Sequence, residues 1–284
     1  MEYVSSRGIL KSCDYHSDKP ISSVKRMVFY PTFVYKEKPV IYVCGSALPH
    51  FRTMMPQFPF ILVTGDCDET MPDDVMNDFE IFISNPNLLH WFSQNMTMTH
   101  PKVTRIPIGL DYHTMATRDV WGPITSEENQ ERLLKTIRNK GLGKRKLMCY
   151  ANFHFQMNTK HGYDRKDALS VPAHLVYYEP NHVPRLKTWM NQIQYAFVIS
   201  PHGGGYDCHR LWEALILGCI PIVKTSPIDP LYEELPVLIV KEWTDVTEEL
   251  LKKTIDDFEN VVFDIEKLKL DYWMNKIKTK TKLV

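Results

Sequence analysis

The sequence lacks a long hydrophobic run, an excess of charge of either sign, and closely spaced cysteines. No stretch approaches the roughly 18 apolar residues that a membrane-spanning helix needs, so we expect no membrane insertion. Lys plus Arg equals Asp plus Glu, 34 against 34, so no general attraction to a polyanion exists and we expect no nucleic-acid partner. The six cysteines form no C-x-x-C motif, which predicts reduced thiols, mostly buried. Residues 1–16 lack the apolar core of a signal peptide, so the expected location is cytoplasmic.

Two catalytic motifs are also missing. The tetrapeptide HGGG at 202–205 occurs in the oxyanion loop of lipase-like hydrolases, but those enzymes need a downstream G-x-S-x-G turn for their nucleophile, and this sequence has none. The dinucleotide fingerprint G-x-G-x-x-G is absent as well, because the three glycines are contiguous and do not follow the first strand. Both absences argue against a serine hydrolase and an NAD-dependent enzyme.

Apolar runs that alternate with helical patterns are what the sequence does contain. Short runs rich in β-branched residues predict buried strands; they lie at 40–45, 59–65, 79–84, 103–109, 146–153, 174–178, 195–200, 219–224 and 236–241. Helical periodicity is predicted between them. It covers 88–96, 184–194, 206–217 and the lysine-rich tail 247–284, and within the polar segment 113–145 it covers a helix that begins near Glu127 and is ended by Gly141 and Gly143.

This alternation indicates an α/β protein with two Rossmann-like domains, because continuous apolar strands separated by helices form parallel sheets that are covered on both faces. The polar segment divides the strands into two series. We therefore expect an N-terminal domain at 1–115 and a C-terminal domain at 116–260. The last segment, 261–284, is expected to be a helix that packs back on the N-terminal domain.

The segment SPHGGGYDCHRLWEALILGCIPIV, residues 200–223, carries the chemistry. It follows a predicted strand, and ligands bind at the carboxyl ends of strands in an open parallel sheet. Bare glycine backbone and the start of a helix favour a phosphate group. Arg210 can clamp a diphosphate with two parallel hydrogen bonds, and Glu213 can accept hydrogen bonds from two ribose hydroxyls. The alternative is that Arg210 and Glu213 merely form a surface ion pair.

This segment resembles the C-terminal signature of exostosin-like glycosyltransferases of the family 47 type. IPIGLDYHT (106–114) and CYANFHF (149–155) resemble other blocks of short members, so the likeness spans about residues 60–243. In size and in lacking an anchor, the chain is most similar to compact exostosin-like transferases of large algal viruses, one group of which is associated with xylose transfer to viral glycans. A viral origin would place the protein in the host cytoplasm.

The resemblance implies a GT-B fold, with two domains facing a cleft, and a glycosyltransferase that moves a sugar from a UDP-sugar to a hydroxyl of a glycan or glycoprotein. Inversion by base-assisted direct displacement is expected, with UDP-xylose as the donor. It implies that Arg210 holds the diphosphate and Glu213 the ribose, and that no metal or other cofactor is needed. Other donor-binding candidates lie at or after the predicted strand 146–153 and in the segment 200–223; they are Asn152, Arg165, His202, Gly203, Gly204, Gly205, Tyr206, Asp207 and His209.

An inverting transfer needs a base for the acceptor hydroxyl. The acidic loop GDCDETMPDD (65–74) after a predicted strand supplies the candidates Asp73, Asp66 and Asp68, one of which would act. Asp111 and His113 are less favoured. Three alternatives stay open: Asp66-Cys67-Asp68 as a D-x-D motif that binds Mn²⁺ or Mg²⁺, a retaining transferase that needs no base, and a non-catalytic nucleotide- or carbohydrate-binding protein.

Overall fold

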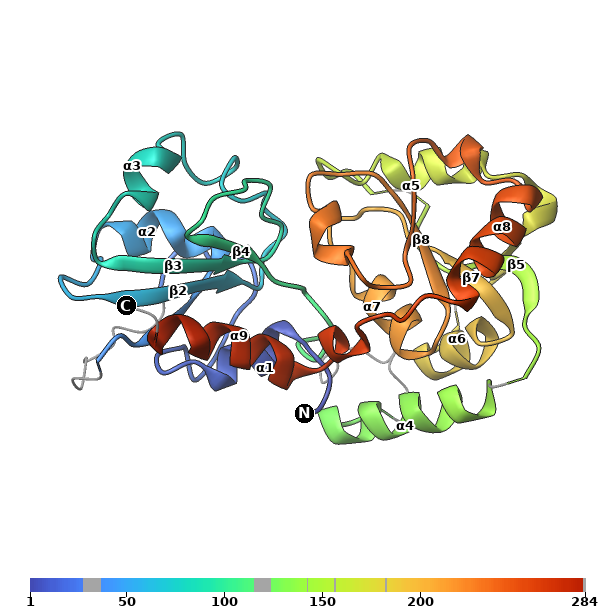
Figure 1. The fold of residues 1–284 in the computed structure, drawn as a ribbon, viewed down its shortest axis with the longest axis horizontal. Helices are drawn as coiled ribbons and strands as arrows, with labels where there is room; N and C mark the ends of the chain where they lie inside the picture. Colours follow the sequence, from blue (N-terminus) through green and yellow to red (C-terminus); the bar gives the residue numbers. More distant parts are fainter. Residues whose placement is uncertain (28–36, 115–123, 142, 156, 182, 283–284) are drawn as a thin grey trace.

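The computed structural model describes residues 1–27, 37–114, 124–141, 143–155, 157–181 and 183–282. They form two α/β domains that lie side by side, each built on a parallel sheet (Figure 1). The expected class, α/β with two Rossmann-like domains whose parallel sheets face a cleft, is confirmed. The expected boundary at 115/116 lies outside the described residues.

The first domain has a four-stranded sheet in the simple order β1-β2-β3-β4, all parallel. Its strands are β1 (Val40–Cys44), β2 (Phe60–Gly65), β3 (Leu88–Ser93) and β4 (Val103–Arg105). Alternate strand residues enter two different cores, one under α1 (Ser6–Ser12) and α9 (Leu270–Lys282), the other under α2 (Leu48–Arg52) and α3 (Phe79–Ile83). Both faces are thus covered, which explains the continuous apolar runs.

Two predictions in this domain were wrong. Residues 79–84 are not a strand but contain α3, and residues 88–96 are not a helix but contain β3. In α3 the buried residues are Phe79, Phe82 and Ile83, while Ile81 is 72% exposed, which is helical spacing. Both runs are short and apolar, and such runs do not reveal their secondary structure by periodicity alone. Pairing with β2 decides which of them joins the sheet.

The second domain has a five-stranded parallel sheet in the order β6-β5-β7-β8-β9. The strands are β5 (Lys146–Ala151), β6 (Val176–Tyr178), β7 (Tyr195–Ile199), β8 (Ile220–Lys224) and β9 (Leu238–Val240). All five match predicted runs. The strand order reverses direction between β5 and β7, so the connections after these two strands run to opposite faces of the sheet. Such a reversal creates a crevice at the carboxyl ends of the strands.

The helices around the second sheet largely follow the predicted periodicity. They are α4 (Glu127–Lys140), α5 (Asp164–Asp167), α6 (Arg185–Gln192), α7 (His209–Ile216) and α8 (Glu248–Glu259). Short 3-10 turns complete the chain: η1 (Gly45–Ala47), η4 (Ala168–Ser170), η5 (Ala173–Leu175), η6 (Asp229–Tyr232), η7 (Trp243–Asp245) and η8 (Ile265–Leu268). The first helical residue of α7 is His209, later than the predicted 206, so the loop before it is longer than the sequence indicates.

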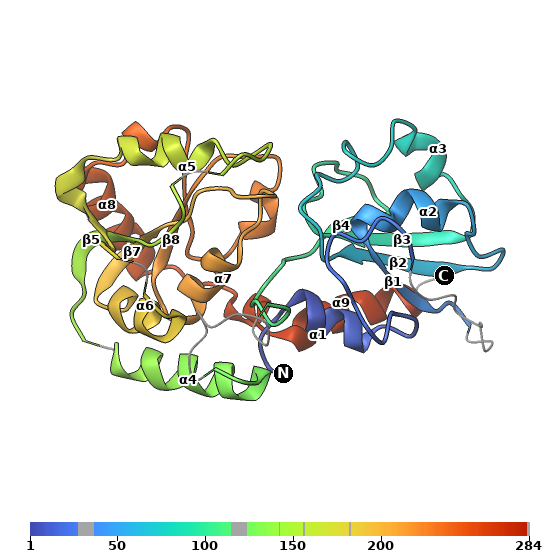
Figure 2. The same cartoon turned by 180° about the vertical axis from the view of Figure 1, so that it is seen from behind.

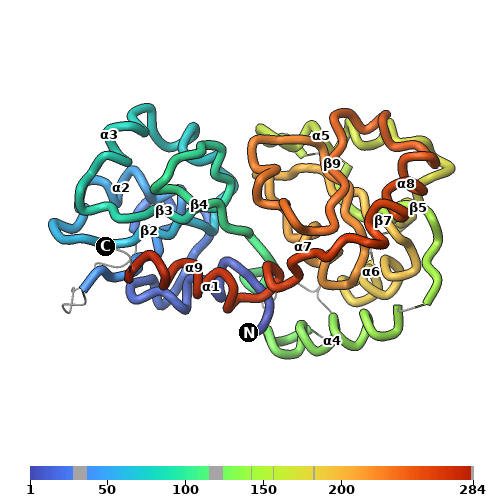
Figure 3. Tube along the Cα trace, in the orientation of Figure 1, coloured from blue at the N-terminus to red at the C-terminus, as the bar shows by residue number. Residues whose placement is uncertain are grey.

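The chain crosses between the domains after β4 and returns after α8, so that α9 lies beside α1 beneath the first sheet (Figures 2 and 3). Trp273, Met274 and Ile277 of α9 are buried there. Among the described residues, no helix combines the length and the apolar character needed to cross a bilayer.

Candidate functional site

A cleft of about 930 Å³ lies between the two domains. Apart from Ser6, Ser22 and Ser23 near the N-terminus, its lining comes from the segments that follow β2 and β4 in the first domain and those that follow β5, β6 and β7 in the second. All of these are carboxyl ends of parallel strands. The reversal of strand order between β5 and β7 faces the same space, which is the expected ligand position in a doubly wound sheet.

The glycine triplet after β7 makes room for side chains. A methyl group built on Gly203 would lie 2.8 Å from a guanidinium nitrogen of Arg165, and one on Gly205 would lie 2.5 Å from the amide nitrogen of Asn95. One on Gly204 would lie 2.1 Å from a carboxylate oxygen of Asp68. Two of these neighbours belong to the first domain. The bare backbone therefore lets the two domains approach each other, a role that the sequence reasoning did not foresee.

Two arginines of the second domain reach the cleft without a carboxylate partner among the described residues. The side chain of Arg165 donates to the carbonyl oxygens of His202 (3.2 Å) and His154 (3.3 Å), and Arg210 donates to that of Pro201 (3.3 Å). The guanidinium of Arg210 also stands 5.4 Å from the ring centre of Phe153.

Burial lowers the pKa of Arg210 to about 10, and repulsion from Arg165 acts in the same direction. Arg210 is still cationic at neutral pH. Keeping cations that repel each other in a partly desolvated place costs free energy, and a bound anion would offset that cost.

The predicted alternative of a surface ion pair between Arg210 and Glu213 is wrong. Glu213 is 1% exposed, and one of its oxygens accepts hydrogen bonds from the indole of Trp189 (3.0 Å) and from Arg185 (3.3 Å). Arg185 lines the cleft, whereas Glu213 does not. The other carboxylate oxygen, Oε1, is buried and accepts no hydrogen bond from any described residue.

Asp66 and Asp68 line the cleft from the first domain. Asp66 is buried in the left-handed backbone region (φ 55°) and pairs with Arg7 at 2.9 Å. Burial raises the pKa of Asp66, while Arg7 and His209 oppose this shift. Asp68 is exposed to solvent in the cleft, and its pKa is raised by partial desolvation between the cleft walls and by the neighbouring Glu69. The two carboxylates therefore differ: Asp66 is held in an ion pair with Arg7, whereas Asp68 faces the cleft.

Asp73, the third candidate base, is exposed and does not line the cleft. It accepts a hydrogen bond from the hydroxyl of Thr97 at 3.3 Å. The neighbouring Asp74 forms an ion pair with Lys160 of the second domain at 2.7 Å. This end of the acidic loop therefore contributes to the contact between the domains.

Two other predicted residues, Asp207 and His209, also serve domain contact. Asp207 is buried and accepts hydrogen bonds from the backbone N–H of Ile108 (2.8 Å) and the indole of Trp212 (2.8 Å). Burial raises the pKa of Asp207 to about 6. Tyr206 stays within the second domain, where its ring lies 3.9 Å from that of His161, centre to centre. The Nδ1–H of His209 donates a hydrogen bond to the carbonyl oxygen of Gly109 at 2.6 Å.

Of the remaining predicted residues, Asn152 lines the cleft and His202 is buried behind it. Asn152 lines the cleft and donates to the hydroxyl of Thr188 at 2.7 Å. His202 is buried beside Asp164, which accepts its backbone N–H at 2.8 Å, and is not part of the lining. Burial lowers the pKa of His202. His202 therefore supports the loop that carries the glycines.

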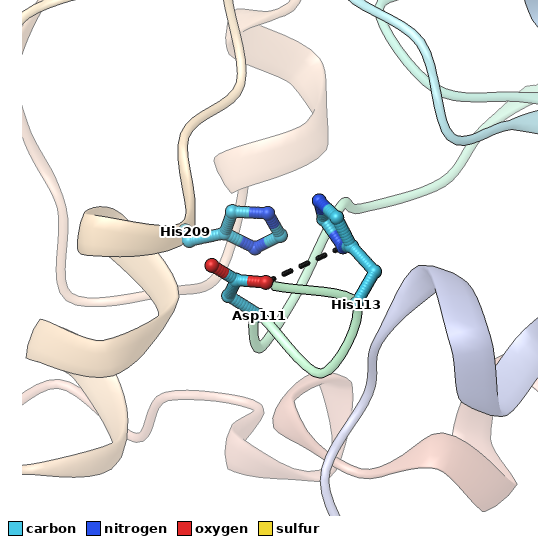
Figure 4. Close-up of side chains that lie close together, drawn as sticks. All are labelled: Asp111, His113 and His209. Carbon is cyan, nitrogen blue, oxygen red and sulfur yellow. Dashed lines mark ion pairs between the residues drawn. The ribbon is translucent and has the colours of Figure 1, made fainter. Parts of the chain in front are cut away.

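The sequence reasoning missed Arg7 and Arg185, and it undervalued Asp111 and His113. The last two line the cleft opposite His209 (Figure 4). Burial opposes the ionisation of Asp111, but His209, His113 and hydrogen bonds from Thr114 outweigh it and lower the pKa of Asp111 to about 2. The motif GLDYH was a usable signal, whereas nothing near Arg7 in the sequence points to the cleft.

Comparison with known proteins adds little. No protein-family model and no curated protein matches this chain. Among solved structures, a crystal structure of a glycosyltransferase from Rickettsia africae ESF-5 matches with a TM-score of 0.35 and 12% sequence identity. That match covers 85% of this chain and 72% of the other.

Proposed function

We propose that this protein is a glycosyltransferase that moves a sugar from a nucleoside-diphosphate sugar to a hydroxyl of a glycan. The observation that carries the proposal is the pair Arg165 and Arg210, cationic and without carboxylate partners among the described residues, at the strand-order reversal of the second sheet. A diphosphate supplies the anion that such a pair lacks, and it is the leaving group of glycosyl transfer.

In this proposal the second domain stabilises the leaving group. Arg210 and Arg165 would hold the diphosphate, and the first turn of α7 would direct its N–H groups toward the same anion. As the bond between sugar and phosphate breaks, negative charge grows on the phosphate oxygen. Positive groups already fixed in place stabilise that charge without reorganisation, which lowers the barrier.

The first domain would supply the base. We assign this role to Asp68, since it is exposed in the cleft, lies against the glycine loop and is not held by an arginine. Its carboxylate would take the proton of the acceptor hydroxyl while that oxygen attacks the anomeric carbon from the side opposite the leaving diphosphate. The product would be inverted. Asp66, paired with Arg7, would serve to shape the loop.

Glu213 is expected to act on the donor through Arg185, because Arg185 pairs with Glu213 and itself lines the cleft. Glu213→Ala should weaken the binding of UDP by about 10-fold, the cost of losing one charge-assisted hydrogen bond. Glu213→Gln keeps an oxygen that can accept the hydrogen bond from the indole of Trp189, so it should weaken UDP binding less than Glu213→Ala does. Titration calorimetry measures both, with Glu128→Ala on the exposed side of α4 as the control. Unchanged UDP affinity in Glu213→Ala would remove the donor-binding role.

The test of the function itself is calorimetric titration with UDP, GDP and a panel of UDP-sugars, each in EDTA and in Mn²⁺. We expect UDP and one UDP-sugar to bind in EDTA. The resemblance of residues 200–223 to exostosin-like glycosyltransferases favours UDP-xylose as that donor. Absence of binding by every nucleotide in both media contradicts the proposal, and tight UDP binding with neither transfer nor donor hydrolysis would indicate a non-catalytic binding protein.

A further inference from the structure

Two histidines and a carboxylate meet across the domain boundary (Figure 4). Asp111 and His113 come from the segment after β4 in the first domain, and His209 is the first residue of α7 in the second. One potential ligand atom from each lies within 4.8 Å of the other two. All three residues line the cleft, and Asp111 is buried.

We propose that Asp111, His113 and His209 bind one divalent transition-metal ion, of the Zn²⁺ or Mn²⁺ type, that links the two domains. Two imidazoles and one carboxylate are ligands that such ions accept, whereas Mg²⁺ and Ca²⁺ prefer an all-oxygen set. Ligand atoms at about 2.0–2.2 Å from a metal stand roughly 3–3.5 Å apart, so side-chain shifts of about 1 Å would complete the site.

Two of the ligands are already oriented. The Nδ1–H of His209 donates to the carbonyl oxygen of Gly109 at 2.6 Å, which leaves Nε2 with the lone pair that a metal needs. Asp111 accepts hydrogen bonds from the backbone N–H of Thr114 at 3.1 Å and from its hydroxyl. One Asp111 oxygen also stands 3.4 Å from Nδ1 of His113, which places both side chains on the same side of the loop.

Three protein ligands leave at least one coordination position open, and here it would face the cleft. A water molecule or an anionic substrate oxygen would occupy it. Because one ligand comes from α7 and two from the first domain, the ion would bind only when the domains are apposed as they are here. This site is distinct from the D-x-D motif at 66–68, and it does not depend on the proposed function.

The experiment uses the full chain, stripped with a chelator and titrated with Zn²⁺ or Mn²⁺ alone, without nucleotide. We expect one equivalent to bind, and His209→Ala and His113→Ala to weaken it by about 100-fold or more. His174→Ala, an exposed histidine elsewhere in the second domain, is the matched control and should bind like the wild type. Circular dichroism of each variant reports its folding.

Co²⁺ gives a second readout that needs no variant. A site with two histidines and a carboxylate should produce one saturable ligand-field absorption band, which Zn²⁺ should displace. Absence of such a band, or equal Zn²⁺ and Mn²⁺ affinity in wild type, His113→Ala and His209→Ala, would overturn the proposal. Since no nucleotide is present, such a failure leaves the UDP titration unaffected, and failure of UDP to bind leaves the metal result unaffected.

Discussion

Arg210→Ala should lower the rate of sugar transfer by on the order of 10²-fold or more while the protein stays folded. The reason is the position of the guanidinium, which faces the cleft beside Arg165. Among the described residues, it donates a hydrogen bond to the carbonyl oxygen of Pro201 and stands over the ring of Phe153. Removing the Arg210 side chain should therefore cost the fold little stability, whereas the leaving diphosphate loses one of the positive charges that would stabilise it.

Steady-state kinetics with the donor found by calorimetry measures this effect. Arg210→Lys keeps the charge but not the planar two-pronged donor, and it should lie between wild type and Arg210→Ala. The control is Arg26→Ala, an exposed arginine outside the cleft lining. A wild-type rate in a folded Arg210→Ala protein would show that this arginine does not stabilise the leaving group.

Gly109→Ala should destabilise the protein by about 3 kcal/mol. Gly109 has φ 64°, in the left-handed region, where a side chain costs roughly 1–2 kcal/mol. An added methyl group would also lie 2.0 Å from the carbonyl oxygen of Val4, which is backbone and cannot turn away. Relieving such overpacking typically costs a further 1–3 kcal/mol or so.

Urea unfolding measures the loss of stability. Gly143→Ala is the matched control, since a methyl group there would meet no atom of the described residues within 4 Å, and its midpoint should stay close to that of the wild type. Gly109→Ala should also disturb the cleft, because the Gly109 carbonyl oxygen holds His209. An unchanged unfolding midpoint would mean that the N-terminal segment around Val4 can move away at little cost.

Much of the second domain follows from local sequence. Its strands alternate with helices that have clear start and stop signals, and Gly141 caps α4 as predicted. Trp189 and Trp212, which lie on the apolar faces of the predicted helices, are fully buried. The glycine–arginine loop is predicted to lie at a strand end, and it does, because the carboxyl end of β7 is defined by the same apolar run that makes the strand.

The first domain shows where local pattern fails. The runs that became α3 and β3 are both short and apolar, and only the pairing of β3 with β2 and β4 separates them. The acidic loop shows the same limit at the site. The sequence does not distinguish between the three aspartates at 66, 68 and 73. In the structure, however, Arg7 from α1 pairs with Asp66, and Asp73 does not line the cleft.

The sequence by itself determined the fold class, the cleft-facing loop of the second domain and the cation Arg210. Strand periodicity and the position of a loop after a strand are local properties, so a single sequence carries them. Only the tertiary structure decided that Glu213 pairs with Arg185, that Gly204 and Gly205 make room for the first domain, and that Asp111 and His113 meet His209. Those contacts join residues far apart in the chain, and domain packing, which no local pattern encodes, brings them together.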